Sequence, residues 1–234
     1  MADQPIIVGV DVAARRPCTA VALRGGRTAR VAEWLETSDR RALIDWIVRL
    51  APQVVAIDAP QGWNRRLLGR ASYRSRVCDY ELLRRGLGVY QVPAKADIEN
   101  GTVRLPDWIG VGFELFRALR RRGFESPPDG AIPGAFGQSP AMIEVYPYAA
   151  FVTLLGHRPR AKADRQGLAA RVRALRQAGV EWDDYFDHDS LDALAAALTG
   201  WRYLQGRGSA LGDPREGLLW LPIPRGELRE SYRV

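Results

Sequence analysis

The stretch IIVGVDV, residues 6–12, does most to decide the fold. It is short, rich in β-branched residues and almost unbroken by polar side chains, which is typical of a strand covered on both faces. A second stretch of this kind, VVAI at residues 54–57, runs into Asp58, Ala59 and Pro60. Ligands of open α/β sheets favour the carboxyl ends of parallel strands, and both Asp11 and Asp58 are predicted to fall there.

The two stretches that follow residues 6–12 predict an antiparallel meander. Residues 18–23 and 29–35 alternate between apolar and polar side chains, and the glycines of the intervening Arg24-Gly25-Gly26-Arg27 favour a tight hairpin turn. A helix is expected over residues 40–50, because residues 37–39 offer capping oxygens and Pro52 prevents its continuation.

The rest of the chain predicts a mixed sheet with helices on its faces, an α/β fold in one domain over residues 1–234. Residues 61–140 read as an insertion or cap, with helices and a polar loop. The segment at residues 217–223 is expected to be a late edge strand or a packed extended tail. The remaining expected elements are helices at 74–85 and 109–122, a loop at 95–106, a strand at 141–146, and helices at 148–155, 164–178 and 190–204.

Composition favours a cytoplasmic globular protein with an anionic partner. Hydrophobic residues make up 47% of the 234 residues, and neither a membrane-spanning apolar run nor a secretory signal is present in the sequence. Two cysteines cannot form a disulfide framework. The formal net charge of +7, carried almost wholly by arginine, suits nucleic acid, although a solvated basic surface explains it equally well.

Acidic residues form the candidate site. Asp189 and Asp192 are three residues apart and therefore share one face of a helix start, which can join Asp11 and Asp58. Carboxylates that lie close together raise each other's pKa unless a cation lies between them. Hard oxygen ligands without a histidine or thiolate cluster suit Mg²⁺ or Mn²⁺, which support phosphodiester hydrolysis.

Three of the acidic residues also fit other roles. Asp189 can simply cap the last long helix, and Asp11 can be a turn residue satisfied by backbone amides. Glu144 lies in the middle of a predicted strand, so it points either to solvent from an edge strand or inward as a polar site residue.

Six pieces, spread in order over most of the chain, carry a family resemblance: VGVDVA (8–13), AIDAPQGW (56–63), RVCDYELLRRGLG (76–88), IEVYP (143–147), KADRQGLAARVRAL (162–175) and HDSLDALAAALTG (188–200). With them the chain resembles the DUF429 family, which is described as predicted ribonuclease H-like nucleases. The last piece is similar to the final helix of RuvC-type Holliday-junction resolvases, which implies metal-ligating roles for Asp189 and Asp192. Those resolvases usually carry a glutamate on the fourth strand, where this chain has the shorter Asp58.

The leading hypothesis is a Mg²⁺- or Mn²⁺-dependent nuclease acting on DNA or RNA. Asp11 would bridge two metal ions, Asp58 and Asp192 would complete their shells, and Asp189 or Glu144 would orient water. The predicted phosphate contacts are Arg76, Arg84, Lys162 and Arg171, each of which can also be an ordinary solvated helix charge.

Two other classes of function remain open. A small-molecule phosphotransferase of the actin and sugar-kinase type shares the core, but residues 13–17 lack the glycine expected in a phosphate-cradling turn. A nucleic-acid-binding or scaffolding protein that kept the fold without catalysis is the other. Trp63, Tyr73 and Tyr90 suit either core packing or stacking on bases.

Overall fold

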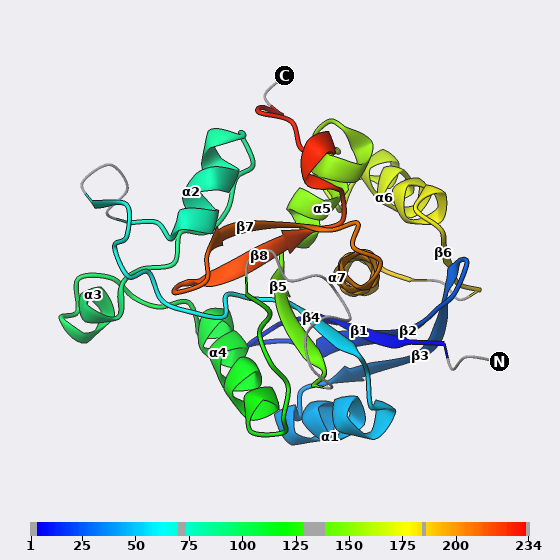
Figure 1. Cartoon of the computed structure of the whole chain (residues 1–234), viewed down its shortest axis with the longest axis horizontal. Helices are drawn as coiled ribbons and strands as arrows, with labels where there is room; N and C mark the ends of the chain where they lie inside the picture. The colour runs from blue at the N-terminus through cyan, green and yellow to red at the C-terminus, as the bar shows by residue number, and fades with distance from the viewer. Residues whose placement is uncertain (1–3, 70–73, 129–138, 184–185, 233–234) are drawn as a thin grey trace.

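The computed structural model describes residues 4–69, 74–128, 139–183 and 186–232. In these ranges eight strands form one sheet in the order β6-β3-β2-β1-β4-β5-β8-β7 (Figure 1). The strands are β1 (Ile6–Asp11), β2 (Cys18–Gly25), β3 (Ala29–Thr37), β4 (Val54–Asp58), β5 (Ala141–Val145), β6 (Val180–Glu181), β7 (Ser209–Asp213) and β8 (Gly217–Leu221). β1, β2 and β3 form an antiparallel meander, whereas β4, β5 and β8 run parallel to β1. The predicted α/β fold, a mixed sheet in which an antiparallel meander adjoins parallel strands, is confirmed.

The helices begin and end close to where the sequence predicts them. They are α1 (Arg40–Leu50), α2 (Val77–Arg84), α3 (Lys95–Glu99), α4 (Asp107–Arg120), α5 (Pro147–Leu155), α6 (Arg165–Gln177) and α7 (His188–Leu204). For α1 both ends agree with the prediction. The side chain of Asp39 accepts hydrogen bonds from the backbone N–H groups of Arg41 and Ala42, and Ala51 closes the helix in a left-handed conformation just before Pro52.

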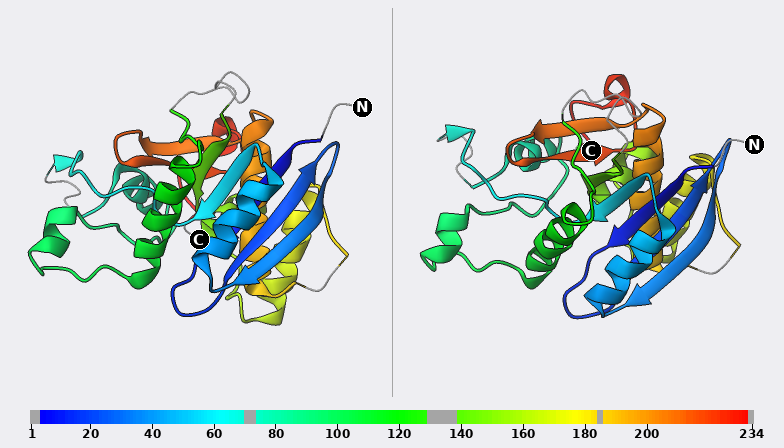
Figure 2. Two further views of the ribbon diagram at one scale, coloured as in Figure 1. Left: turned by 90° about the horizontal axis from the view of Figure 1, so that it is seen from below. Right: turned by 60° about the horizontal axis from the view of Figure 1, so that its bottom comes forward.

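Helices cover both faces of the sheet (Figure 2). α1 and α4 pack against one face in a cluster that contains Val8, Val10 and Ile57. α5, α6 and α7 pack against the opposite face, where the cluster contains Ile7 and Ala56. Side chains alternate between the faces of a strand, so the residues at the ends of β1 and β4, Asp11 and Asp58, project to the α7 face.

α7 lies directly on β1, backbone against backbone. A Cβ atom at Gly9 would lie 2.1 Å from the carbonyl oxygen of Ala193 and 2.3 Å from the amide nitrogen of Ala197. Only glycine therefore fits at this position of β1. The alanine-rich face of α7 makes this approach possible.

Gly9→Ala is expected to destabilise the protein by about 1–3 kcal/mol or more, because the added methyl group must push α7 off the sheet. Urea unfolding measures the change. Gly110→Ala in α4 is the matched control: its Cβ meets nothing within 4 Å, so it is expected to stabilise the helix by about 0.5–1 kcal/mol. Equal stability of the two variants would show that α7 is not held as described.

The structure corrects the prediction for the end of the chain. The segment at residues 217–223 contains β8, which lies inside the sheet between β5 and β7 and is therefore neither an edge strand nor an extended tail. The edge strand on this side is β7 and the one on the other side is the two-residue β6. The sequence analysis missed both of them and the short α3. The helix expected at residues 74–85 begins later, at Val77.

The region of residues 61–140 contains α2, α3 and α4, and it is fastened to the C-terminal hairpin. α2 packs against β7, β8 and α5 through a third apolar cluster. Glu216, in the turn between β7 and β8, is buried. Its Oε1 accepts a hydrogen bond from the N–H of Arg65 (2.6 Å) and its Oε2 accepts one from the N–H of Val77 (2.8 Å). One carboxylate thus ties the middle of the segment that joins β4 to α2 to the first residue of α2.

Candidate metal centre

Asp11 and Asp58 are brought side by side at the carboxyl ends of two neighbouring strands. β1 and β4 are parallel, and Asp11 and Asp58 are partners in their register, which places their backbones about 5 Å apart. The first turns of α7 carry Asp192 to the same place. All three side chains line one cavity of about 720 Å³. The structure therefore brings together the three acidic residues that were predicted as metal ligands.

Two side-chain cations lie among these carboxylates. Nη2 of Arg16 is 2.8 Å from Oδ2 of Asp11, and Nη1 is 2.6 Å from Oδ2 of Asp189. Nζ of Lys162 is 3.1 Å from Oδ2 of Asp192 and 3.5 Å from Oδ1 of Asp189. The Arg16 and Lys162 side chains are 42% and 45% exposed, so each can rotate toward solvent. Lys162, predicted as a phosphate contact, thus forms ion pairs with two carboxylates of the site.

Asp58 differs from the other acids because no side-chain cation of the described residues pairs with it. Among the residues that the structure describes, none forms a hydrogen bond or an ion pair with its carboxylate. Burial raises the pKa of Asp58 well above its usual range, and the charges of Asp11 and Asp192 raise it further. Burial also raises the pKa of Asp11, to about 6, although Arg16 acts in the opposite direction. The site therefore gathers more carboxyl groups than its own cations pair with.

The residues present suit a hard divalent cation once the two basic side chains move aside. In the described ranges no three Asp, Glu, His or Cys side chains are arranged to hold a metal ion as they stand. Arg16 and Lys162 instead form ion pairs with three of the carboxylates. Movement of these side chains would leave the oxygens of Asp11, Asp58 and Asp192 facing the cavity. An all-oxygen set of this kind fits Mg²⁺ or Mn²⁺.

Asp189 is a member of this charged cluster and is not the cap of α7. The capping residue is Asp187, whose side chain accepts a hydrogen bond from the N–H of Ser190. Asp189 contacts Arg16 and Lys162, and its Oδ1 lies 2.7 Å from Nδ1 of His188. Its place in the structure is to hold the two cations over the other carboxylates.

Glu144 lies in the interior of the sheet, so the edge-strand alternative is wrong. β5 pairs with β4 on one side and β8 on the other. Its neighbours Ile143 and Val145 pack in the cluster that contains α7, so Glu144 points away from α7, and it also lines the cavity that holds Asp11 and Asp58. The Glu144 carboxylate accepts hydrogen bonds from both Nη atoms of Arg76 (2.8 and 2.6 Å) and from the N–H of Gln61 (2.9 Å).

The structure separates the four predicted phosphate contacts. Arg76 is only 1% exposed, because its guanidinium also binds Asp79 at 2.8 Å, and it is thus neither a surface charge nor free to bind phosphate. Arg171 lines the cavity and is fixed by the carbonyl oxygens of Arg160 and Gly167. Arg84 lies on the exposed side of α2, over the Tyr80 ring, and is not among the residues that line the cavity.

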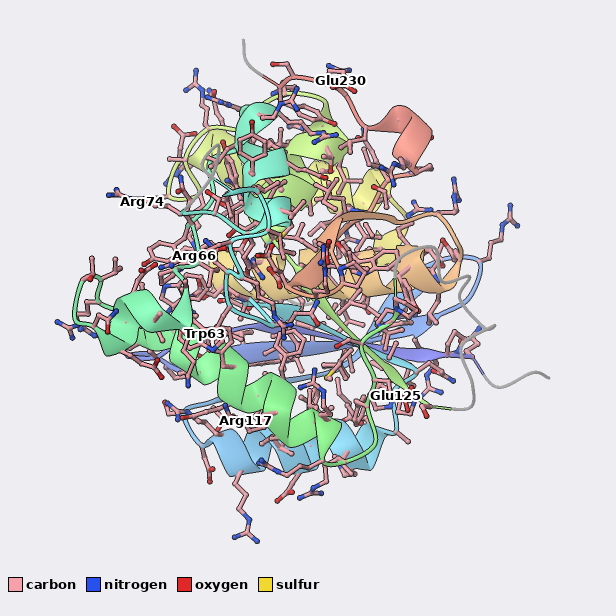
Figure 3. All side chains as sticks on the ribbon, turned by 60° about the vertical axis from the view of Figure 1, so that its left-hand side comes forward. Trp63, Arg66, Arg74, Arg117, Glu125 and Glu230 are labelled. Carbon is pink, nitrogen blue, oxygen red and sulfur yellow. The ribbon has the colours of Figure 1, made fainter. Side chains whose placement is uncertain are left out.

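The aromatic candidates have different surroundings. Trp63 packs against Phe113 of α4 with ring centroids 4.6 Å apart, beside the helix seen in Figure 3. Tyr90 is exposed and meets the ring of Trp108 edge-on at 6.0 Å. Tyr73 lies outside the described residues.

Sequence analysis missed two residues that line the cavity, Trp108 and Arg16. The one signal for Arg16 was its position in the short loop that follows Asp11.

Comparisons with known proteins add a family and no activity. The family model described as "Protein of unknown function (DUF429)" matches residues 9–216. No curated protein and no solved structure matches the chain. Within the described residues, no helix is long and apolar enough to span a membrane.

Proposed function

The chain belongs to the DUF429 family, for which no function is known, so its activity must be inferred from the geometry of the site, and we propose that it is a divalent-metal-dependent nuclease. In this proposal Asp11, Asp58 and Asp192 hold Mg²⁺ or Mn²⁺. The substrate is the phosphodiester backbone of nucleic acid, which suits the net charge of +7.

The observation that carries the proposal is the carboxylate of Asp58. It is register partner to Asp11, it faces the same cavity as Asp192, and it has no cation partner in the described part of the chain. A carboxylate kept in such a place costs stability, and it is seldom left uncompensated without a functional reason. A bound divalent cation would supply the missing charge.

The remaining residues have roles that their contacts define. When bound, the cation supplies charge for a phosphate oxygen and favours ionisation of a water nucleophile. Arg16 and Lys162, displaced from the carboxylates, stay at the cavity wall, where they can bind phosphate oxygens. Arg171 adds a fixed positive charge to that wall. Arg76 is a positioning residue, since it holds Glu144, which in turn fixes the backbone at Gln61, three residues after Asp58.

Metal binding and cleavage are tested separately. Mn²⁺ at about 100 times its Kd is expected to stabilise the protein by about 2.7 kcal/mol, which raises the Tm by roughly 5 °C or more for a chain of this size. A panel of single-stranded, duplex and junction DNA and RNA, with Mg²⁺ or Mn²⁺ and with EDTA, tests cleavage. An unchanged Tm together with no metal-dependent product would overturn the proposal.

Asp58→Asn is expected to stabilise the metal-free protein and to remove the response to Mn²⁺. The amide keeps the shape of the side chain but removes a charge that Asp11 and Asp192 oppose, so the gain should be about 0.5–2 kcal/mol. Thermal unfolding with and without Mn²⁺ measures both effects. The exposed Asp45, on α1, provides the control: Asp45→Asn should keep the parent's response. A metal-free Asp58→Asn protein less stable than the parent would contradict the prediction.

A further inference from the structure

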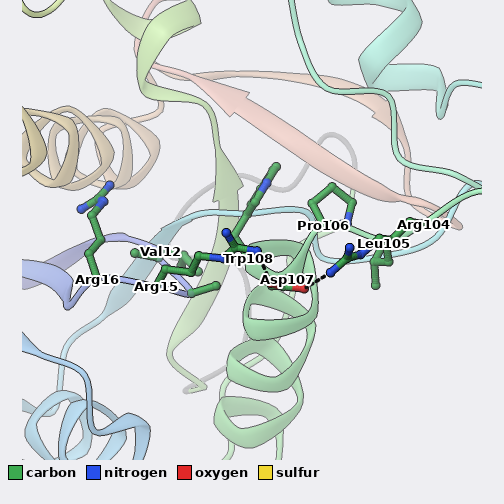
Figure 4. Close-up of a pocket in the computed structure, with 10 residues that line it drawn as sticks. Val12, Arg15, Arg16, Arg104, Leu105, Pro106, Asp107 and Trp108 are labelled. Atoms are coloured by element: carbon green, nitrogen blue, oxygen red, sulfur yellow. Dashed lines mark hydrogen bonds and ion pairs between the residues drawn. The ribbon is translucent and has the colours of Figure 1, made fainter.

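A second groove adjoins the carboxylate cavity. It has a volume of about 580 Å³ and is lined by the loop after β1 and by the chain that leads into α4 (Figure 4). Val12, Arg16 and Trp108 line both the groove and the cavity. The two spaces are therefore neighbours that share a wall, and a chain-like ligand seated in one can continue into the other.

The groove carries two loosely held guanidinium groups. Figure 4 shows Arg15 and Arg104 reaching Asp107 from two sides, while Arg16 points away from them. The ion pairs to Asp107 are long, at 3.4 Å for Arg15 and 4.0 Å for Arg104, and both arginine side chains are 85% exposed. Exposed pairs of this kind contribute little. One carboxylate facing two arginines also leaves a positive charge for an anion such as phosphate.

The wall between the two spaces is aromatic. Trp108 lines both, and Tyr90 stands beside it and lines the cavity. Tyr146 and Tyr148 line the cavity as well, their ring centroids 5.9 Å apart. Aromatic rings next to guanidinium groups are the combination that binds single strands, because each base has a π face to stack and each phosphate a charge to pair.

The size of the cavity also favours a single strand. A volume of about 720 Å³ lies in the range of small-molecule pockets, roughly 300–1,000 Å³, so it has room for a nucleotide and not for a duplex. The carboxylates lie inside this space. A phosphodiester can reach them only if its strand is unpaired or its nucleotide is turned out of the helix.

On these grounds we propose that the ligand of this surface is a single nucleic-acid strand, which runs from the carboxylate cavity across Trp108 to Arg15 and Arg104. The inference rests on the proposed function, since it names the substrate class of the same site. Trp108 stacks with a base, and the two arginines bind the phosphates beyond it. DNA and RNA share this chemistry.

Binding without cleavage tests the proposed path. Fluorescent single-stranded oligonucleotides, one DNA and one RNA, are titrated with the full chain in EDTA and compared with the blunt duplex. The parent should bind a single strand more tightly than the duplex. Trp108→Ala should weaken single-strand binding by about 5- to 150-fold, the range found when one stacked base loses its aromatic partner.

A second variant tests whether the two arginines bind phosphates, and it leaves the packing around Trp108 unchanged. Arg15→Gln combined with Arg104→Gln should flatten the slope of log affinity against log salt by about 0.7 for each lost phosphate contact. Two controls lie away from the groove: Trp34→Ala, an exposed tryptophan on β3, and Arg121→Gln, at the other end of α4. Both should bind as the parent does.

The outcomes separate this inference from the nuclease proposal. Trp108→Ala should keep the Tm rise in Mn²⁺, because Trp108 holds no metal. Unchanged single-strand binding by both groove variants, or tighter binding of the duplex, would overturn the strand path even if Mn²⁺ binds. Conversely, loss of strand binding in the groove variants without any Mn²⁺ response in the parent supports the path and overturns the metal site.

Discussion

Asp11→Asn is expected to lower the rate of metal-dependent cleavage by at least about 10²-fold, the cost of removing one preorganised charge from a reacting site. Asp11 lies at the centre of the acidic cluster, since it is register partner to Asp58 and shares Arg16 with Asp189. The amide has the same size, so the fold should remain. The measurement is the initial rate on whichever nucleic acid of the panel the parent cleaves, at saturating Mg²⁺.

Two measurements make this result interpretable. Asp45→Asn, which changes a carboxylate on the outer face of α1, should cleave at the parent's rate. The Tm of metal-free Asp11→Asn should be no lower than the parent's, because burial disfavours the charged form of Asp11. Cleavage by Asp11→Asn at the parent's rate would place the reaction elsewhere on the molecule.

Arg76→Met is expected to destabilise the protein by about 3–5 kcal/mol, the usual cost of leaving a buried charge without its partner. Arg76 donates to both Glu144 and Asp79, and all three side chains are almost inaccessible. Loss of the guanidinium leaves two buried carboxylates facing each other. Urea unfolding measures the change.

The control and the rescue come from the same segment. Arg74→Met replaces an exposed arginine two residues earlier, labelled in Figure 3, and should change stability by no more than about 0.5 kcal/mol. Adding Glu144→Gln to Arg76→Met should recover part of the loss, because one unpaired charge is removed. A loss as small for Arg76→Met as for Arg74→Met would show that the buried pair is not formed.

The sequence predicted the elements whose signals are local. Buried runs that end in aspartate located β1 and β4, and the capping residue Asp39 with Pro52 fixed both ends of α1. The shared sheet edge of Asp11 and Asp58 followed from the assumption that their strands are neighbours, which the register confirms. The spacing of three residues on one helix face correctly predicted that Asp189 and Asp192 lie together.

Contacts between distant segments could not be predicted in this way. Arg76 and Glu144 are 68 residues apart, and nothing local tells an arginine that will be buried from one that will be solvated. β6 has two residues and α3 has five, which is too short for a periodic pattern. Asp187 and Asp189 both suit a helix start, and only the geometry shows that Asp187 is the cap.

The carboxylate of Glu216 gives the turn of the last hairpin an influence beyond its own strands. It anchors Arg65 and Val77, and Val77 follows Arg76, whose partner Glu144 fixes the backbone just after Asp58. A tag, linker or partner domain inserted into this turn would displace Glu216, and these contacts would pass the displacement on to the carboxylates of the site. Fusions are better placed after the described C-terminal residues than between β7 and β8.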